Sequence, residues 1–132
     1  MVEKTPSIAP LNVDGPFDGL IDGRVLQQLE TSLGRSGLDK LLGLFLKHAA
    51  EYLEQLRAQL AVQPMPKKDV QRLIHQLHGE AASVGAFAMA DAAHKLQKNL
   101  EDECAIEQLW KKLEQLSQDT FSVLKAWQNN SR

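Results

Sequence analysis

The sequence predicts an all-α protein, an antiparallel up-down four-helix bundle with a short extra helix at its N-terminus. Good helix formers dominate after Gly23, and apolar residues recur at the three- and four-residue spacing of amphipathic helices. No segment alternates polar and apolar residues as a half-buried strand would. The length of 132 residues suits one domain with a substantial core.

The short N-terminal helix is expected over residues 21–33, with Gly34 as its C-cap. The longest helix is expected over residues 37–62, where Ser36 can cap it. Both segments place their apolar residues on one stripe. The stripe residues are Ile21, Val25, Leu26, Leu29 and Leu33 in the first helix, then Leu38, Leu41, Leu42, Phe45, Leu46, Ala49, Leu53, Leu56 and Leu60 in the second.

The remaining three helices follow the proline-containing segment "QPMPKKD". The third is expected over about 67–84, with Pro66 suited to its first position. Gly85 interrupts the helical pattern before a fourth helix over about 86–102. The last is expected over about 105–128, with Ile106, Leu109, Trp110, Leu113, Leu116, Phe121, Leu124 and Trp127 as its apolar positions.

The predicted domain organisation has three parts. Residues 1–19 are rich in proline and glycine and lack periodicity, so we expect a flexible leader or interdomain linker. Leu11, Val13 and Phe17 are its candidates for docking on the bundle. Residues 20–128 form the bundle, and residues 129–132 are expected to be a disordered tail.

Composition excludes several classes. The 15 basic residues are scattered among 17 acidic ones and form no basic stripe, which argues against nucleic-acid binding. The single cysteine, Cys104, excludes an internal disulfide and a cysteine-based zinc site. No apolar run approaches the roughly 20 residues that span a bilayer, and no signal-peptide core is present. We expect a monomer in the cytoplasm.

One histidine stands out in the third predicted helix. On a wheel at about 100° per residue, this helix has one core stripe. The stripe residues are Val70, Leu73, Ile74, Leu77, Ala81 and Val84. His75 lies about 160° from Leu77, on the opposite side, with Gly79 and Ala82 beside it. A glycine inside a helix costs about 0.5–1 kcal/mol relative to alanine, so Gly79 calls for a reason. It leaves the side of His75 bare, so the surface of another macromolecule can reach the ring.

Two chemistries could use this imidazole. His75 and His78 could share a metal ion, and Asp91 with His94 forms a carboxylate-x-x-His pair. No second Glu-x-x-His occurs, however, and His75 points away from the core, so we expect no metal site. Nor does the sequence suggest the cleft of a nucleophilic triad. The remaining chemistry is nucleophilic attack by the imidazole itself, which can accept a phosphoryl group.

The segment "HQLHGEAASVGA" resembles the signature of histidine-containing phosphotransfer (HPt) domains, H-x-L-[KR]-G-x-[AS]-x-x-x-G-A. The matching residues are His75, Leu77, Gly79, Ala81, Gly85 and Ala86. The segments "IDGRVLQQL" and "FAMADAAHKLQ" also look like the family's first helix and the helix after the motif. The resemblance covers residues 20–127.

This resemblance implies that His75 exchanges a phosphoryl group with the aspartate of a response-regulator receiver domain. It implies that Gln97 hydrogen-bonds the inner ring nitrogen and leaves the outer one to attack. The chain needs no cofactor of its own, because Mg²⁺ is expected in the receiver. Such domains stand alone or form the C-terminal module of hybrid sensor kinases, and the leader favours the module, at the cytoplasmic end of a membrane sensor.

The sequence departs from the signature at one position. The usual Lys or Arg three residues after the histidine is His78, which could attract phosphoryl oxygens only when protonated. Arg72, Lys95 and Lys98 could compensate, although solvated helix charges are the more ordinary interpretation. His48 and His94 are interpreted as structural.

Alternatives remain at this point. A histidine-kinase dimerisation domain also has a phosphohistidine on a helix, but usually with an acid directly after it, where this chain has Gln76. No Walker-type "GxxxxGK[ST]" occurs, so the chain is not expected to be a kinase by itself. A non-catalytic helical adaptor is the other possibility. Phe87 and Ala86 are candidates for the apolar part of a docking face.

Overall fold

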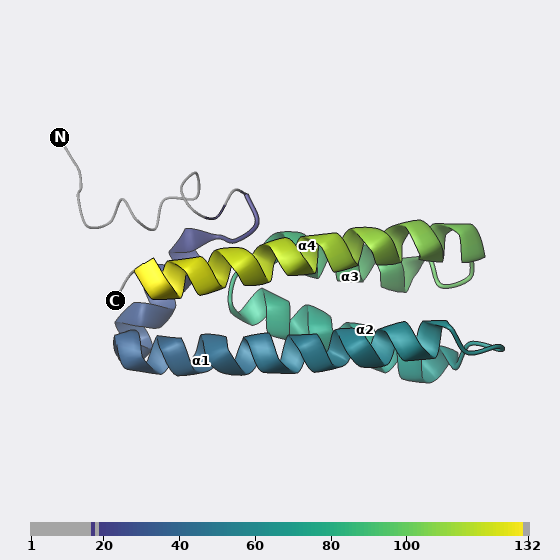
Figure 1. Cartoon of the computed structure of the whole chain (residues 1–132), viewed down its shortest axis with the longest axis horizontal. Coiled ribbons are helices and arrows are strands. Elements are labelled where there is room, and N and C mark those ends of the chain that lie inside the picture. The colour runs from purple at the N-terminus through teal and green to yellow at the C-terminus, as the bar shows by residue number, and fades with distance from the viewer. Residues whose placement is uncertain (1–16, 18, 131–132) are drawn as a thin grey trace.

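The computed structural model describes residue 17 and residues 19–130, which form four helices packed side by side along one long axis (Figure 1). The helices are α1 (Gly23–Leu60), α2 (Lys67–Ser83), α3 (Phe87–Lys98) and α4 (Glu103–Asn130). No strand occurs among the described residues. The predicted all-α four-helix bundle is confirmed.

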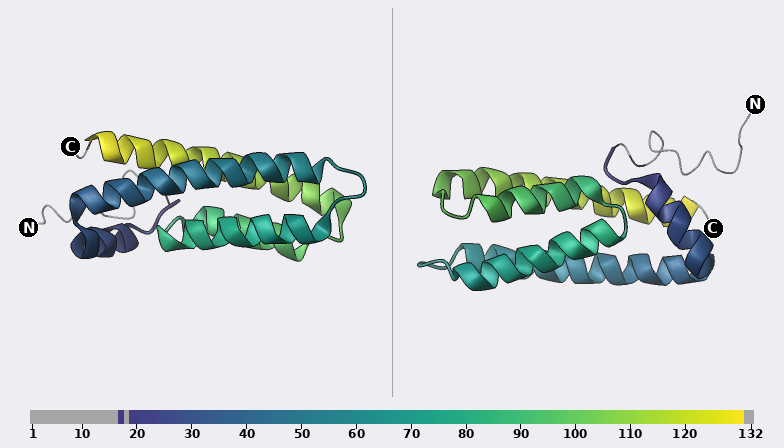
Figure 2. Two further views of the ribbon diagram at one scale, coloured as in Figure 1. Left: turned by 90° about the horizontal axis from the view of Figure 1, so that it is seen from below. Right: turned by 180° about the vertical axis from the view of Figure 1, so that it is seen from behind.

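Gly34 divides α1 into a short and a long part. Its φ of 77° and ψ of 167° are not helical, and a positive φ is readily adopted only by glycine. The part before Gly34 turns away from the long axis and crosses the end of the bundle (Figure 2). The short N-terminal helix is therefore present, as predicted. Leu33 is 48 % exposed, so its assignment to the buried stripe was wrong.

The start of α1 holds the turn between α2 and α3. The Asp22 backbone N–H donates to the Gly85 carbonyl oxygen at 2.8 Å, and the Ala88 N–H donates to the Leu20 carbonyl oxygen at 3.5 Å. Gly85 has a φ of +80°, and a Cβ there would lie 2.8 Å from the Cβ of Val25. These contacts fix the C-terminal end of α2 relative to the short part of α1.

Asp22 caps α1. Its side chain accepts a hydrogen bond from the Arg24 N–H at 3.0 Å and another from the Arg24 Nε at 3.2 Å. The hydrogen bonds from the Arg24 side chain and backbone hold the pKa of the Asp22 carboxyl below its usual value. Folding therefore favours the ionised form of the Asp22 side chain, which caps the helix.

The core runs the length of the bundle and includes a residue from the expected leader. Phe17 is fully buried, and its ring centroid lies 6.2 Å from that of Trp127. Packing therefore begins at least as early as residue 17. Leu11 and Val13, the other docking candidates, lie outside the described residues. α4 continues to Asn130, so the expected tail at 129–132 overlaps the helix.

Several helix boundaries differ from the predictions by a few residues. α3 ends at Lys98, because Asn99 leaves the helical conformation and its side-chain amide donates to the Lys95 carbonyl oxygen at 2.8 Å. α4 begins at Glu103, because the Asp102 side chain accepts from the Ala105 N–H at 3.1 Å. Pro66 is the N-cap of α2 and not its first helical residue. Within the described residues, no helix is both long and apolar enough to cross a bilayer.

Candidate functional site

His75 lies on the outer face of α2, on its third turn. The predicted core stripe of this helix is buried, from Val70 at its start to Val84 just past its end. His75, Gly79 and Ala82 are exposed on the opposite side. The wheel prediction is therefore confirmed: one side of α2 packs into the core, and the opposite side exposes the imidazole to solvent.

A shallow hollow surrounds the His75 side chain. It has a volume of about 440 Å³ and lies between α2 and the long part of α1. Its lining residues are Tyr52, His75, Gln76, Gly79, Glu80 and Ser83. The hollow is open to solvent, so an approaching group can reach the ring without movement of a buried side chain.

Gly79 leaves free space beside the hollow. A Cβ built on Gly79 would meet no atom within 4 Å, so neither a neighbouring helix nor a tight turn requires glycine there. The backbone at Gly79 is helical, so its conformation does not require glycine either. The missing side chain affects only what can approach the exposed face of α2.

His78 and Gln97, the two residues expected to assist His75, lie on the α3 side of α2 and on α3 itself. The rings of His78 and His94 face each other across α2 and α3, with centroids 5.9 Å apart and planes inclined at 44°. Gln97 is half-buried near the end of α3. In the part of the chain that the structure describes, no hydrogen bond joins Gln97 to His75, and the role of Gln97 stays a prediction.

Two of the three candidate cations pair with acids on their own helices. Lys95 lies 3.1 Å from Asp91, and an Arg72 nitrogen lies 4.0 Å from an Asp69 oxygen. Lys98 is exposed. The solvated interpretation of these charges fits their places, since none lines the hollow around His75.

Two residues of the hollow were not identified from the sequence. Tyr52 comes from α1, and Glu80 lies 3.6 Å from the His48 Nδ1, which joins the two helices. A wheel for one helix cannot show which residues of another helix lie beside it. The only available signal was the position of His48 and Tyr52, four residues apart at the edge of the apolar stripe.

The apolar candidates for the docking face differ from each other. Phe87 is 50 % exposed at the start of α3. Ala86 is fully buried, and its N–H donates to the Ala81 carbonyl oxygen at 2.9 Å within the turn. A buried residue cannot form part of a docking face, so the expectation for Ala86 was wrong. Among the described residues, no three His, Cys, Asp or Glu side chains are grouped so that they could hold a metal ion.

Comparisons with known proteins agree with this arrangement. The family model for the Hpt domain matches residues 40–127. The structure is similar to the X-ray structure of a putative histidine-containing phosphotransfer protein from rice, with a TM-score of 0.80 and 18 % identity over 92 % of this chain and 89 % of that one. No curated protein sequence matches the chain. The chain belongs to the Hpt domain family, whose members relay phosphoryl groups through a histidine and interact with receiver domains in two-component signal transduction.

Proposed function

We propose that His75 is the residue that accepts and donates the phosphoryl group. The observation that supports this assignment is the position of the ring, which stands in an open hollow on the outer face of α2 beside a glycine that no packing requires. The other three histidines make less suitable acceptors. His48 pairs with Glu80, and the rings of His78 and His94 face each other.

The proposed reaction is a direct transfer between two proteins. The outer ring nitrogen of His75 attacks the phosphorus of the receiver's aspartyl phosphate. A nitrogen–phosphorus bond forms while the phosphorus–oxygen bond to the aspartate breaks, and the freed carboxylate stays on the receiver. Mg²⁺ bound by the receiver would neutralise charge on the phosphoryl oxygens. The chain contributes position, since α2 holds the nucleophile on a rigid element.

The docking face for the receiver surrounds the hollow. It combines the small residues Gly79, Ala82 and Ser83 of α2 with Phe87 of α3. Leu44 of α1, which is 51 % exposed, lies one turn before His48, the residue that contacts Glu80. Small residues allow close approach of a second surface, and exposed apolar residues favour its binding. We expect the complex to be weak and transient.

The test is phosphoryl transfer from phosphorylated receiver domains. The wild-type chain should acquire a label that is labile in acid and stable in base, and His75→Gln should acquire none. His94→Gln is the matched control, because it also removes an exposed imidazole, and it should keep the label. A label that persists in His75→Gln would refute the assignment. Binding of receivers without any label on the wild-type chain would support the adaptor alternative.

A further inference from the structure

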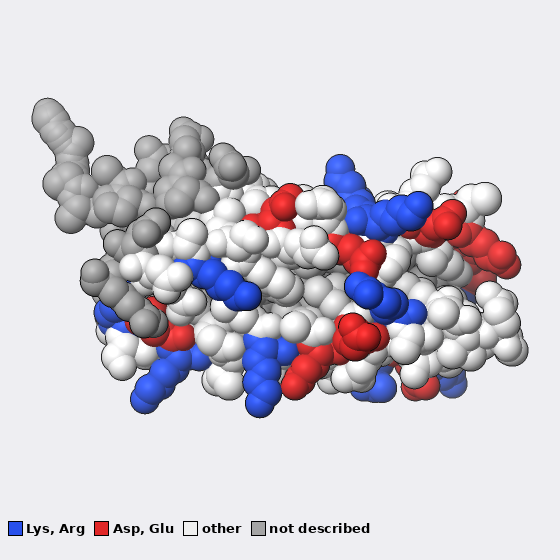
Figure 3. Space-filling model, viewed as in Figure 1, with Lys and Arg blue, Asp and Glu red and all other residues white. Residues whose placement is uncertain are grey.

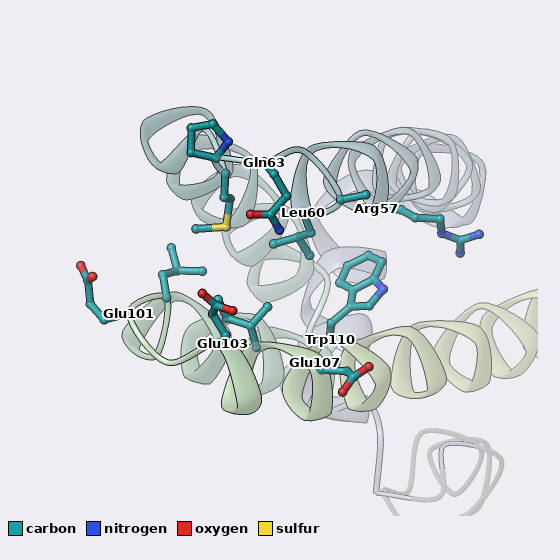
Figure 4. Close-up of a pocket in the computed structure, with 12 residues that line it drawn as sticks. Arg57, Leu60, Gln63, Glu101, Glu103, Glu107 and Trp110 are labelled. Atoms are coloured by element: carbon teal, nitrogen blue, oxygen red, sulfur yellow. The ribbon is translucent and has the colours of Figure 1, made fainter.

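A second cavity lies at the end of the bundle where the α1–α2 and α3–α4 connections meet (Figure 4). Its volume is about 630 Å³, and it shares no residue with the hollow around His75. The lining residues are Arg57, Leu60, Ala61, Gln63, Pro64, Met65, Leu100, Glu101, Glu103, Ile106, Glu107 and Trp110. The Hpt reaction gives this cavity no role.

Seven of the twelve residues that line the cavity are apolar, and four of the other five are charged. Leu60 and Met65 come from the α1–α2 side, and Ile106 and Trp110 come from the first turns of α4. Trp110 is only half-buried, so part of its indole borders the cavity. Binding sites for small molecules are typically concave, about 300–1,000 Å³ in volume, and apolar with a few polar groups. The cavity has such a volume and an apolar wall, but its share of charged groups is larger than is typical.

The charges around the cavity do not balance. Arg57 pairs with Glu114, and Glu101 pairs with Lys67, so these four charges are compensated. Glu103 and Glu107 make no ion pair with any other residue that the structure describes. Both come from α4; in Figure 4 Glu103 lies between Glu101 and Trp110, and Glu107 lies beside Trp110 with its carboxylate turned away from the ring. Figure 3 shows acidic side chains, with some basic ones beside them, at this end of the molecule.

We propose that this cavity binds a small organic cation with an aromatic or alkyl body. The body would replace water against the apolar side chains of Leu60, Met65 and Ile106. The ammonium group would lie against the Trp110 ring on the α4 side of the cavity, where the negative charges of Glu103 and Glu107 attract it. Aromatic faces attract cations, Trp most strongly. An anion of the same size would meet two uncompensated carboxylates and should be excluded.

Nuclear magnetic resonance tests this proposal on the intact chain. Benzyltrimethylammonium is titrated into the ¹⁵N-labelled protein, and phenylacetate is titrated separately as the anionic counterpart. The indole N–H signal of Trp110 should shift in a saturable way with the cation, with a dissociation constant of about 1 mM. The signal of Trp127, which is packed against Phe17 elsewhere, serves as an internal control.

A charge variant tests the role of the two carboxylates. The double substitution Glu103→Gln and Glu107→Gln should weaken binding of the cation by about threefold to tenfold. Glu51→Gln with Glu54→Gln is the matched control, because it removes the same charge from exposed positions of α1 outside the cavity. The proposal is overturned if Trp110 does not respond to the cation, if phenylacetate binds equally well, or if both double variants weaken binding to the same extent.

Discussion

Two glycines of the same motif, Gly79 and Gly85, have opposite surroundings. Gly85 is buried, adopts a φ of +80° and leaves no room for a Cβ beside Val25. Gly79 is exposed and helical, and a Cβ there would meet nothing within 4 Å. The first glycine is required by the fold, because it forms the turn that α1 holds. The fold would accept many other residues at position 79, so we attribute the glycine there to the approach of a partner protein.

The strongest test of this contrast is alanine at both positions. Gly85→Ala should lower the free energy of unfolding by about 2–5 kcal/mol, because a Cβ is strained at positive φ and collides with Val25. Gly79→Ala should raise it by about 0.5–1 kcal/mol. Urea denaturation followed by circular dichroism measures both values. Equal effects at the two positions would remove the distinction.

A large side chain at Gly79 should separate stability from function. Gly79→Leu should keep or raise helicity while slowing phosphoryl transfer from a receiver by about tenfold or more, because it fills the approach to His75. Gly43→Leu is the matched control. Gly43 is also exposed within a helix, and a Cβ there meets nothing within 4 Å, but it does not line the hollow. Unchanged transfer in Gly79→Leu would show that the cleared surface has no role in docking.

Asp22 caps α1 next to the turn at Gly85, and the stability that this cap provides depends on pH. Asp22→Ala should lower the free energy of unfolding by about 1 kcal/mol at pH 7. The Arg24 hydrogen bonds lower the pKa of Asp22 in the folded state, so the stabilisation is complete above the unfolded pKa of about 3.9 and is lost as pH falls through the folded pKa. Denaturation at pH 7 and in acid should show the two proteins converging. A difference that persists in strong acid would contradict this account.

The smallest expected effect concerns the cation missing from the motif. His78→Lys restores the usual residue of the signature and supplies a charge for the phosphoryl oxygens. Transfer to His75 should become about two- to fivefold faster, the range expected for a partly solvated charge. The rate is measured with one phosphorylated receiver at saturating concentration. His94→Lys adds the same charge on α3 and should leave the rate nearer to that of the wild type.

Most of the fold could be predicted from the sequence, since helical periodicity depends on local spacing. The break at Gly34, the turn at Gly85 and the exposure of His75 all followed from residue types along one helix. The sequence could not show that Tyr52 and Glu80 border the same hollow as His75, because that depends on how two helices are aligned. The cavity beside Trp110 was missed for a similar reason. In the sequence, Ile106 and Trp110 belong to an ordinary apolar stripe of the last helix. The cavity exists because of how the α1–α2 and α3–α4 connections are arranged beside that stripe.

Phe17 and Gln128, which lie close to the two limits of the described residues, make their contacts at the same end of the bundle. Figure 1 shows the end of α4 beside the start of α1. Phe17 stacks near Trp127, and the Gln128 side chain donates to the Asp39 carbonyl oxygen at 3.4 Å. His75 borders the same hollow as Tyr52. Tyr52 lies about 20 Å from Asp39 along α1, at a rise of about 1.5 Å per residue. A receiver linked to the bundle near Phe17 or Gln128 would have to span that distance before its local concentration at His75 could exceed that of free competitors.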